Sequence, residues 1–207
     1  MGDNGTIVKW NGLVWTPQLS GTSNWLYGVW GTDASNVWAV GDNGTVVKWD
    51  GTAWSYQSTG TITTLIRVWG SNASNVWAVG DNGTIVRWNG SAWSTFFFRP
   101  TDGFMGVWGS DASNVWVVGD RGTILHWDRA TWSMQSSGTN FNLVGVWGSD
   151  ANNVWAVGDR GTVVKWNGSV WSPQNSYTDA RLNSVWGRDA NNVWTIGDGT
   201  IIKGGGF

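Results

Sequence analysis

The chain contains no cysteine, no glutamate and a single histidine in 207 residues. The absence of cysteine excludes disulfides, thiolate nucleophiles and cysteine-based zinc sites. All 14 acidic residues are aspartates, so few side chains remain that could perform general acid–base catalysis. We therefore expect a protein that is not an enzyme and that binds no cofactor or metal. A ring of equivalent aspartates holding a cation is a minor alternative.

The charge and hydropathy patterns argue against two further classes of protein. The net charge is −2, and the 12 basic residues form no run, which argues against binding to nucleic acid or to an anionic membrane. No apolar run reaches the length of a membrane span, and no signal-peptide pattern opens the chain. Met1 and Gly2 lead directly into the middle of a repeat. We interpret the sequence as a mature form, or as an excised or engineered piece of a longer array.

Tryptophan, in contrast, is abundant, with 21 residues. All but Trp25 fall into four series with a constant step of 39 residues. The series are Trp30, Trp69, Trp108, Trp147 and Trp186; Trp38, Trp77, Trp116, Trp155 and Trp194; Trp10, Trp49, Trp88, Trp127 and Trp166; and Trp15, Trp54, Trp93, Trp132 and Trp171. A fixed period of this length, built from strand-like runs, indicates a radial or stacked repeat architecture.

Each unit contains four short runs that are rich in valine and tryptophan and bounded by Gly, Asn or Asp. In one unit they cover residues 26–31, 37–40, 45–49 and 53–56. The turns between them carry Asn or Gly where positive φ is needed, although Asp128-Arg129-Ala130 lacks the glycine and should be strained or differently shaped. We predict an all-β, five-bladed β-propeller with four antiparallel strands per blade and one domain over residues 1–207.

The two ends of the chain are expected to share one blade. The chain begins with a third and a fourth strand, residues 7–10 and 14–15, and ends with a first and a second strand. A competing third strand lies at residues 199–203, but the copy at residues 7–10 retains Trp10 and is the one we predict to close the ring. The strand left over would stay free or exchange between molecules, so a monomer and a strand-exchanged oligomer are both open.

The unit Val29-Trp30-Gly31, Asn36 to Asp42, Gly44-Thr45 and Trp49 resembles the Trp- and Gly-rich propeller repeats of bacterial secreted and surface proteins. This resemblance covers nearly the whole chain and implies a secreted or cell-surface location. The blade count is also similar to that of the tachylectin family of five-bladed lectins, although no sugar-contact motif of that family is matched. The second resemblance implies multivalent binding of carbohydrate or surface glycan, with up to five equivalent sites.

Binding residues are expected in the connection from the fourth strand of one unit to the first strand of the next, because this segment varies among the copies. The Asp-x-Gly turns should border the same face. The candidates are Trp25, Tyr27, Arg67, Phe98, Arg99, Phe141, Tyr177, Arg181, Asp42, Asp81, Asp120 and Asp159. An aromatic ring would stack on a sugar, and Asp or Arg would bind its hydroxyls.

Structural roles compete with this interpretation. The periodic tryptophans are more readily explained as core between blades, and the aspartates as turn residues that cap backbone N–H groups. The segment Phe96-Phe97-Phe98 fits an exposed loop or a packing plug as well as it fits a binding site. The alternative to a lectin is therefore a structural or protein-interaction propeller that binds no small molecule.

Overall fold

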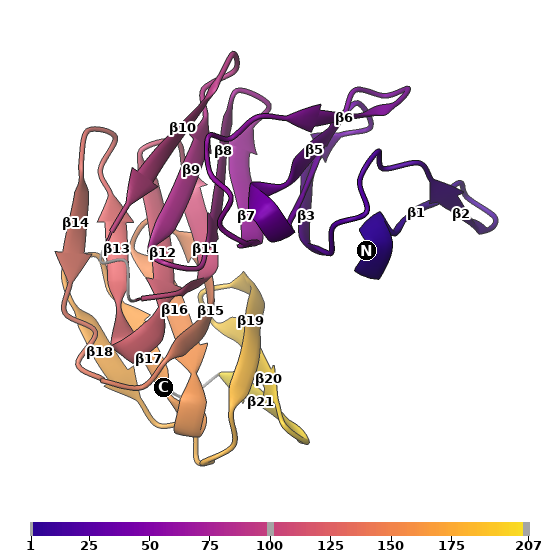
Figure 1. Cartoon of the computed structure of the whole chain (residues 1–207). Coiled ribbons are helices and arrows are strands. Elements are labelled where there is room, and N and C mark those ends of the chain that lie inside the picture. Colours follow the sequence, from indigo (N-terminus) through magenta and orange to yellow (C-terminus); the bar gives the residue numbers. More distant parts are fainter. Residues whose placement is uncertain (1, 99–101, 205–207) are drawn as a thin grey trace. The chain divides into compact units, whose positions relative to one another are not determined.

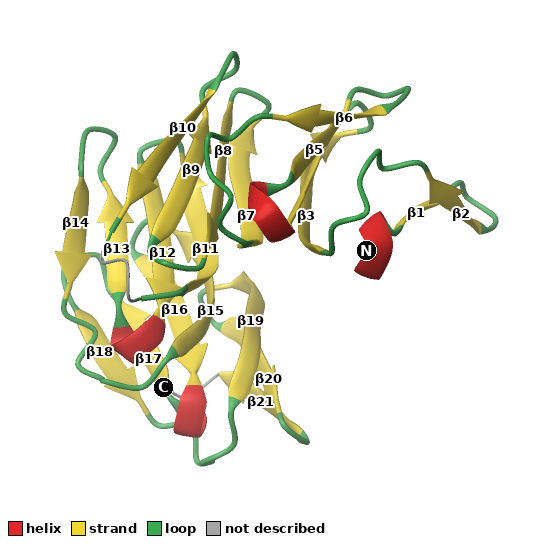
Figure 2. Ribbon diagram, in the orientation of Figure 1, coloured by secondary structure: helices red, strands yellow, loops and turns green. Residues whose placement is uncertain are grey.

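The computed structural model describes residues 2–98 and 102–204. Their regular structure consists of β-strands and short 3-10 turns (Figure 2). The chain divides into two compact units, residues 1–101 and residues 102–207, and each unit is built from antiparallel sheets of consecutive strands (Figure 1). The all-β prediction is confirmed. Over these described residues, no helix is long and apolar enough to span a membrane.

Unit 1 consists of a hairpin and two four-stranded sheets. The hairpin follows the 3-10 turn η1 (Asp3–Gly5) and is formed by β1 (Ile7–Trp10) and β2 (Trp15–Gln18). The first sheet contains β3 (Leu26–Asp33), β4 (Asn36–Gly41), β5 (Val46–Trp49) and β6 (Trp54–Gln57), with η2 (Asp42–Gly44) between β4 and β5. The second contains β7 (Leu65–Asn72), β8 (Asn75–Gly80), β9 (Thr84–Trp88) and β10 (Trp93–Phe97).

Unit 2 consists of two four-stranded sheets and one three-stranded sheet. The first contains β11 (Phe104–Asp111), β12 (Asn114–Gly119), β13 (Ile124–Trp127) and β14 (Trp132–Gln135), with the 3-10 turn η3 (Asp120–Gly122). The second contains β15 (Leu143–Asp150), β16 (Asn153–Gly158), β17 (Val163–Trp166) and β18 (Trp171–Gln174), with η4 (Asp159–Gly161). The last contains β19 (Leu182–Asp189), β20 (Asn192–Gly197) and β21 (Thr200–Gly204).

The core lies between consecutive sheets, as the two-sided apolar pattern of the second strands predicts. Trp38 and Val40 on β4 pack against Leu65, Val68 and Val76 of the next sheet. Successive residues of a strand point to opposite faces, so Ala39 joins a separate cluster on the other side of β4. The tryptophans of the four series differ in burial: Trp38 is fully buried, whereas Trp54 is only half-buried.

The turns follow the predicted chemistry. Asp33 accepts a hydrogen bond from the backbone nitrogen of Ser35 at 2.8 Å, which confirms its expected role as a turn cap. In η2, Asn43 and Gly44 adopt φ of 55° and 65°, in the left-handed region that these two residues tolerate best. Arg129 stands where the other hairpins have glycine and adopts a φ of 85°, which bears out the expected strain.

The capped aspartates predict a loss of stability in acid. Hydrogen bonds from the backbone of Ala53, and then from the side chain and backbone of Thr52, lower the pKa of Asp50 to about 2 from 3.8. A carboxylate with a depressed pKa contributes stability that is complete above its unfolded pKa and is lost as the pH falls toward the folded pKa. We therefore expect the urea midpoint to fall between pH 4 and pH 2, and to fall less steeply in D50N. Identical pH profiles for the two proteins would contradict this prediction.

The predicted closure by the N-terminal strand is wrong for this structure. β20 pairs with β21, with Thr195 opposite Ile202 and Trp194 opposite Lys203, whereas β1 pairs only with β2 among the described residues. β21 follows β20 after a turn of two residues, Asp198 and Gly199, so little chain entropy is lost when the two strands pair. This local advantage outweighs the missing tryptophan, for which β21 has Gly204.

Candidate functional site

The predicted loops and aspartate turns lie together within each sheet. The backbone N–H of Asp42 donates to the carbonyl of Trp25 at 3.0 Å, and that of Asp159 donates to Asn142 at 3.0 Å. The same bond joins Asp81 to Thr64, Asp120 to Gly103 and Asp198 to Arg181. Because this backbone contact recurs, the residues beside it occupy equivalent places, while their side chains differ from copy to copy.

In unit 1, four side chains form what we call the Trp25 cluster: Trp25, Tyr27, Asp42 and Thr64. The rings of Trp25 and Tyr27 are half-exposed, with centroids 6.4 Å apart. The Tyr27 hydroxyl donates to Asp42 Oδ2 at 3.2 Å, and Thr64 Oγ1 donates to Asp42 Oδ1 at 3.1 Å. The cluster therefore presents two aromatic faces beside a fixed carboxylate.

The electrostatic environment of the Trp25 cluster is acidic. Desolvation, the hydrogen bond to Asp42 and the charges of Asp42 and Asp81 all raise the pKa of Tyr27, so the phenol stays protonated and donates to the carboxylate. Arg67 is exposed in the same unit, and its guanidinium donates to the neighbouring Ile66 carbonyl at 3.1 Å. The Asp42 carboxylate beside the rings of Trp25 and Tyr27 is suited to a ligand that carries a positive charge.

In unit 2, a second group forms what we call the Phe141 cluster: Phe141, Asp159, Arg160 and Arg181. The Arg160 guanidinium lies 5.3 Å from the centroid of the Phe141 ring, and Arg181 Nε lies 3.3 Å from Asp159 Oδ1. Both arginines are exposed, and the Phe141 ring, which is 42% exposed, has the Arg160 guanidinium beside it. The Phe141 cluster therefore differs in both charge and shape from the Trp25 cluster.

The other predicted residues are dispersed. Tyr177 is 85% exposed at a loop with φ of 57°, where its backbone nitrogen binds Asn175. Phe98 is half-buried and its backbone nitrogen donates to Gly83, while the preceding Phe96 packs on Trp77 with ring centroids 6.3 Å apart. Arg99 lies outside the described residues. Asp120 accepts from the backbone of Gly103 at 2.8 Å, which is a structural role.

Sequence reasoning missed one buried charge. Asp102 is 1% exposed, forms an ion pair with Arg121 and accepts from Thr123 Oγ1 at 3.3 Å. The signal was a pair of departures from the repeat. Arg121 replaces the usual asparagine of the turn, and a charged residue occupies the loop position where other copies have Asn24 or Thr63. Such a matched pair of departures indicates contact, and here it holds the loop rather than a ligand.

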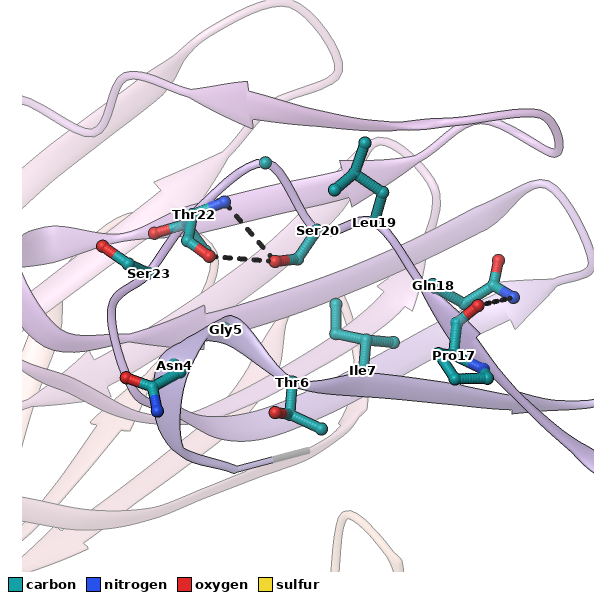
Figure 3. Close-up of a pocket in the computed structure, with 11 residues that line it drawn as sticks. Asn4, Gly5, Thr6, Ile7, Pro17, Gln18, Leu19, Ser20, Thr22 and Ser23 are labelled. Carbon is teal, nitrogen blue, oxygen red and sulfur yellow. Dashed lines mark hydrogen bonds between the residues drawn. The ribbon is translucent and has the colours of Figure 1, made fainter.

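A shallow pocket of about 480 Å³ lies in unit 1 between η1, the start of β1 and the loop after β2 (Figure 3). Its polar groups already bind one another: Ser20 Oγ donates to the Thr22 carbonyl at 3.2 Å and accepts from its backbone nitrogen. Ser137 and Ser176 likewise donate to the carbonyls of Thr139 and Thr178 in unit 2, so this arrangement belongs to the turn. Within residues 2–98 and 102–204, no group of three or more acidic, His or Cys side chains could hold a metal.

Comparisons with known proteins support the fold. No protein-family model matches the chain, and no curated protein matches it. The solved structure of RRP9 WD40 repeats is similar with a TM-score of 0.75 at 14% identity, over 93% of this chain and 67% of that one. YCF48 from Cyanidioschyzon merolae is similar with a TM-score of 0.62 at 20% identity, over 82% of this chain and 63% of that one.

A further structure, described as YCF48 bound to D1 peptide, has a TM-score of 0.47 at 14% identity, over 98% of this chain and 85% of that one. The match to YCF48 from C. merolae, reported above, spans less than two thirds of the length of that protein. At these identities the first two likenesses concern the fold alone. With the repeated four-stranded antiparallel sheets, they show that this chain has a β-propeller-like fold.

Proposed function

We propose that the chain is a non-enzymatic β-propeller that binds a protein partner through its Trp25 cluster. The observation that carries this proposal is the difference between the clusters. Trp25, Tyr27 and Asp42 make an acidic aromatic surface, whereas Arg160 and Arg181 make the Phe141 cluster basic. Five equivalent sugar sites would need the same side chains in each copy, so these differences favour a partner with varied side chains over a repeated glycan.

The chemistry of the Trp25 cluster suggests what part of a partner it would bind. Exposed Trp and Tyr side chains are typical anchors of protein interfaces. A Lys or Arg side chain over the Trp25 ring would gain a cation–π contact and could form a charge-assisted hydrogen bond with Asp42. We therefore expect a polypeptide segment that presents at least one basic residue. The five-blade ring and the single domain over residues 1–207 remain part of this proposal.

The test is selection of displayed random peptides on the wild-type protein, followed by affinity measurement. We expect the selected peptides to contain Lys or Arg and to bind W25A at least tenfold more weakly than the wild type. Their affinity for D42N should lose most of its dependence on salt concentration. The matched control is Y56A, because Tyr56 is also exposed, at 61%, but lies outside the cluster. Peptides that do not distinguish W25A from Y56A, or a glycan-array hit that W25A abolishes, would reject the proposal.

A further inference from the structure

The aspartate in the turn between the second and third strands of a sheet binds a cation in one copy. In unit 2, Arg181 Nε lies 3.3 Å from Asp159 Oδ1. Arg181 belongs to the loop before β19, the first strand of the sheet that follows the turn of Asp159. A carboxylate at this place therefore suits a positively charged group, and in unit 2 the chain supplies that group itself.

The equivalent place in unit 1 holds a neutral donor instead of a cation. Asp42 and Thr64 stand three repeats before Asp159 and Arg181. Thr64 Oγ1 donates to Asp42 Oδ1 at 3.1 Å, where the other copy has the guanidinium. Among the described residues, Asp42 forms no ion pair with Lys or Arg. Its charge is therefore fixed by hydrogen bonds and is left for a cation from outside the chain.

Both oxygens of the Asp42 carboxylate already accept a hydrogen bond. Thr64 donates to Oδ1, and the Tyr27 hydroxyl donates to Oδ2 at 3.2 Å. A carboxylate has about four lone-pair sites, so roughly half of its acceptor capacity is used. An unmodified ammonium group has three N–H donors and would lose hydration here without regaining as many hydrogen bonds. A methylated ammonium group carries the same charge and has fewer donors to satisfy.

The remaining surface of the Trp25 cluster is aromatic. Trp25 and Tyr27 are 51% and 41% exposed, their ring centroids lie 6.4 Å apart, and the ring planes are inclined by 43°. Methyl groups spread the charge of an ammonium group over an apolar surface, which is why aromatic rings attract quaternary ammonium groups. All four residues of the cluster belong to unit 1, so the site is formed within one compact unit.

We propose that the Trp25 cluster binds a methylated lysine side chain of the protein partner. This inference rests on the proposed function, because it specifies the basic residue that the partner presents. The methylated ammonium group lies against the rings of Trp25 and Tyr27, with Asp42 as its counter-charge, and the affinity rises with the number of methyl groups. The Phe141 cluster does not bind this group, because its carboxylate is paired with Arg181 and its ring has Arg160 beside it.

The test uses three small probes that differ only at the end of one side chain. They are acetyl-lysine amide, its form trimethylated on the side-chain nitrogen, and a neutral analogue in which carbon replaces that nitrogen. Binding is followed by fluorine NMR of protein labelled with fluorotryptophan, with the Trp25 resonance assigned by its loss in W25F. We expect the trimethylated probe to shift this resonance and to bind at least about threefold more tightly than either of the others.

Two variants test the roles of the carboxylate and of its hydrogen bonds. D42N should bind the trimethylated probe and the neutral analogue equally, because the counter-charge is gone. T64V frees one acceptor site of Asp42, so the affinity for unmodified lysine should rise and the preference for the trimethylated probe should fall. The matched control is Y56A, which should keep the wild-type preference because Tyr56 is exposed but lies outside the cluster.

Equal affinities for the methylated and unmodified probes, both dependent on Trp25, would overturn this inference and leave the proposed function standing. A trimethylated probe that does not shift the Trp25 resonance would also overturn it, whereas the proposed function is decided by whether displayed peptides distinguish W25A from Y56A. Phosphatidylcholine vesicles present the same quaternary ammonium group and should not bind. Sedimentation of the wild type with these vesicles that W25A abolishes would assign the site to a lipid headgroup and refute a methylated lysine.

Discussion

Replacing Trp116 by alanine is expected to reduce the free energy of unfolding by about 3–5 kcal/mol, the cost of emptying a large buried site. Trp116 is 1% exposed and packs with Val118, Ile124 and Leu143. Its ring also stacks on His126, with centroids 4.5 Å apart. The side chain fills the space between two sheets, so its removal leaves a cavity that the rigid strands cannot collapse to fill.

The matched control is W194A, because Trp194 holds the same repeat position but is 41% exposed. In urea unfolding at dilute protein concentration, W194A should lose clearly less free energy of unfolding than W116A. The reason is that folding buries less of the apolar surface of Trp194 than of Trp116. Equal losses for the two variants would mean that the position in the repeat, rather than the covering neighbour, determines how much the tryptophan contributes to the free energy of unfolding.

Replacing Gly158 by alanine is expected to destabilise the protein by about 3 kcal/mol, at the upper end of overpacking costs. Gly158 has an extended backbone with φ of −171°, so the conformation itself suits any residue. The difficulty is space, because a Cβ would overlap the carbonyl oxygen of Asn142 and lie 2.9 Å from Cα of Leu143. That carbonyl is held in place by the backbone N–H of Asp159 and cannot move without breaking the bond.

Gly2 provides the matched control, since it holds the same repeat position and has no atom within 4 Å of a built Cβ. Thermal unfolding should therefore show a large decrease in Tm for G158A and almost none for G2A. The loop that Asn142 ends also carries Phe141, so G158A should shift the Phe141 resonances in an NMR spectrum. A Tm for G158A within a degree of the wild type would refute the close approach.

The strands and turns were predictable because they depend on local sequence. Valine-rich runs such as residues 37–40 are apolar on both faces and can only be covered strands, and they form β4 and its equivalents. Asn43 and Gly44 lie in the left-handed region as predicted, and Asp33 caps its own turn. Each of these features is settled within a few residues by backbone sterics and hydrogen bonding.

The candidate site was only partly predictable. The period placed Trp25, Tyr27 and Asp42 near one another, and the structure brings them into contact. The pairing of Asp102 with Arg121 was not predicted, because both residues depart from the pattern that the repeats share. Whether Phe96 packs or protrudes was left open, and its contact with Trp77 depends on where a neighbouring strand directs the ring.

The sequence by itself determined the repeat, the strands, the turn residues and the alternation of faces, since these follow from spacing and local conformation. Only the tertiary structure decided which third strand pairs with β20, and which copies of each tryptophan are covered. Trp38 and Trp194 have the same local sequence position, yet they differ in exposure by 41 percentage points (0% against 41%). Burial is a property of what packs against a face, and the local sequence does not decide what packs there.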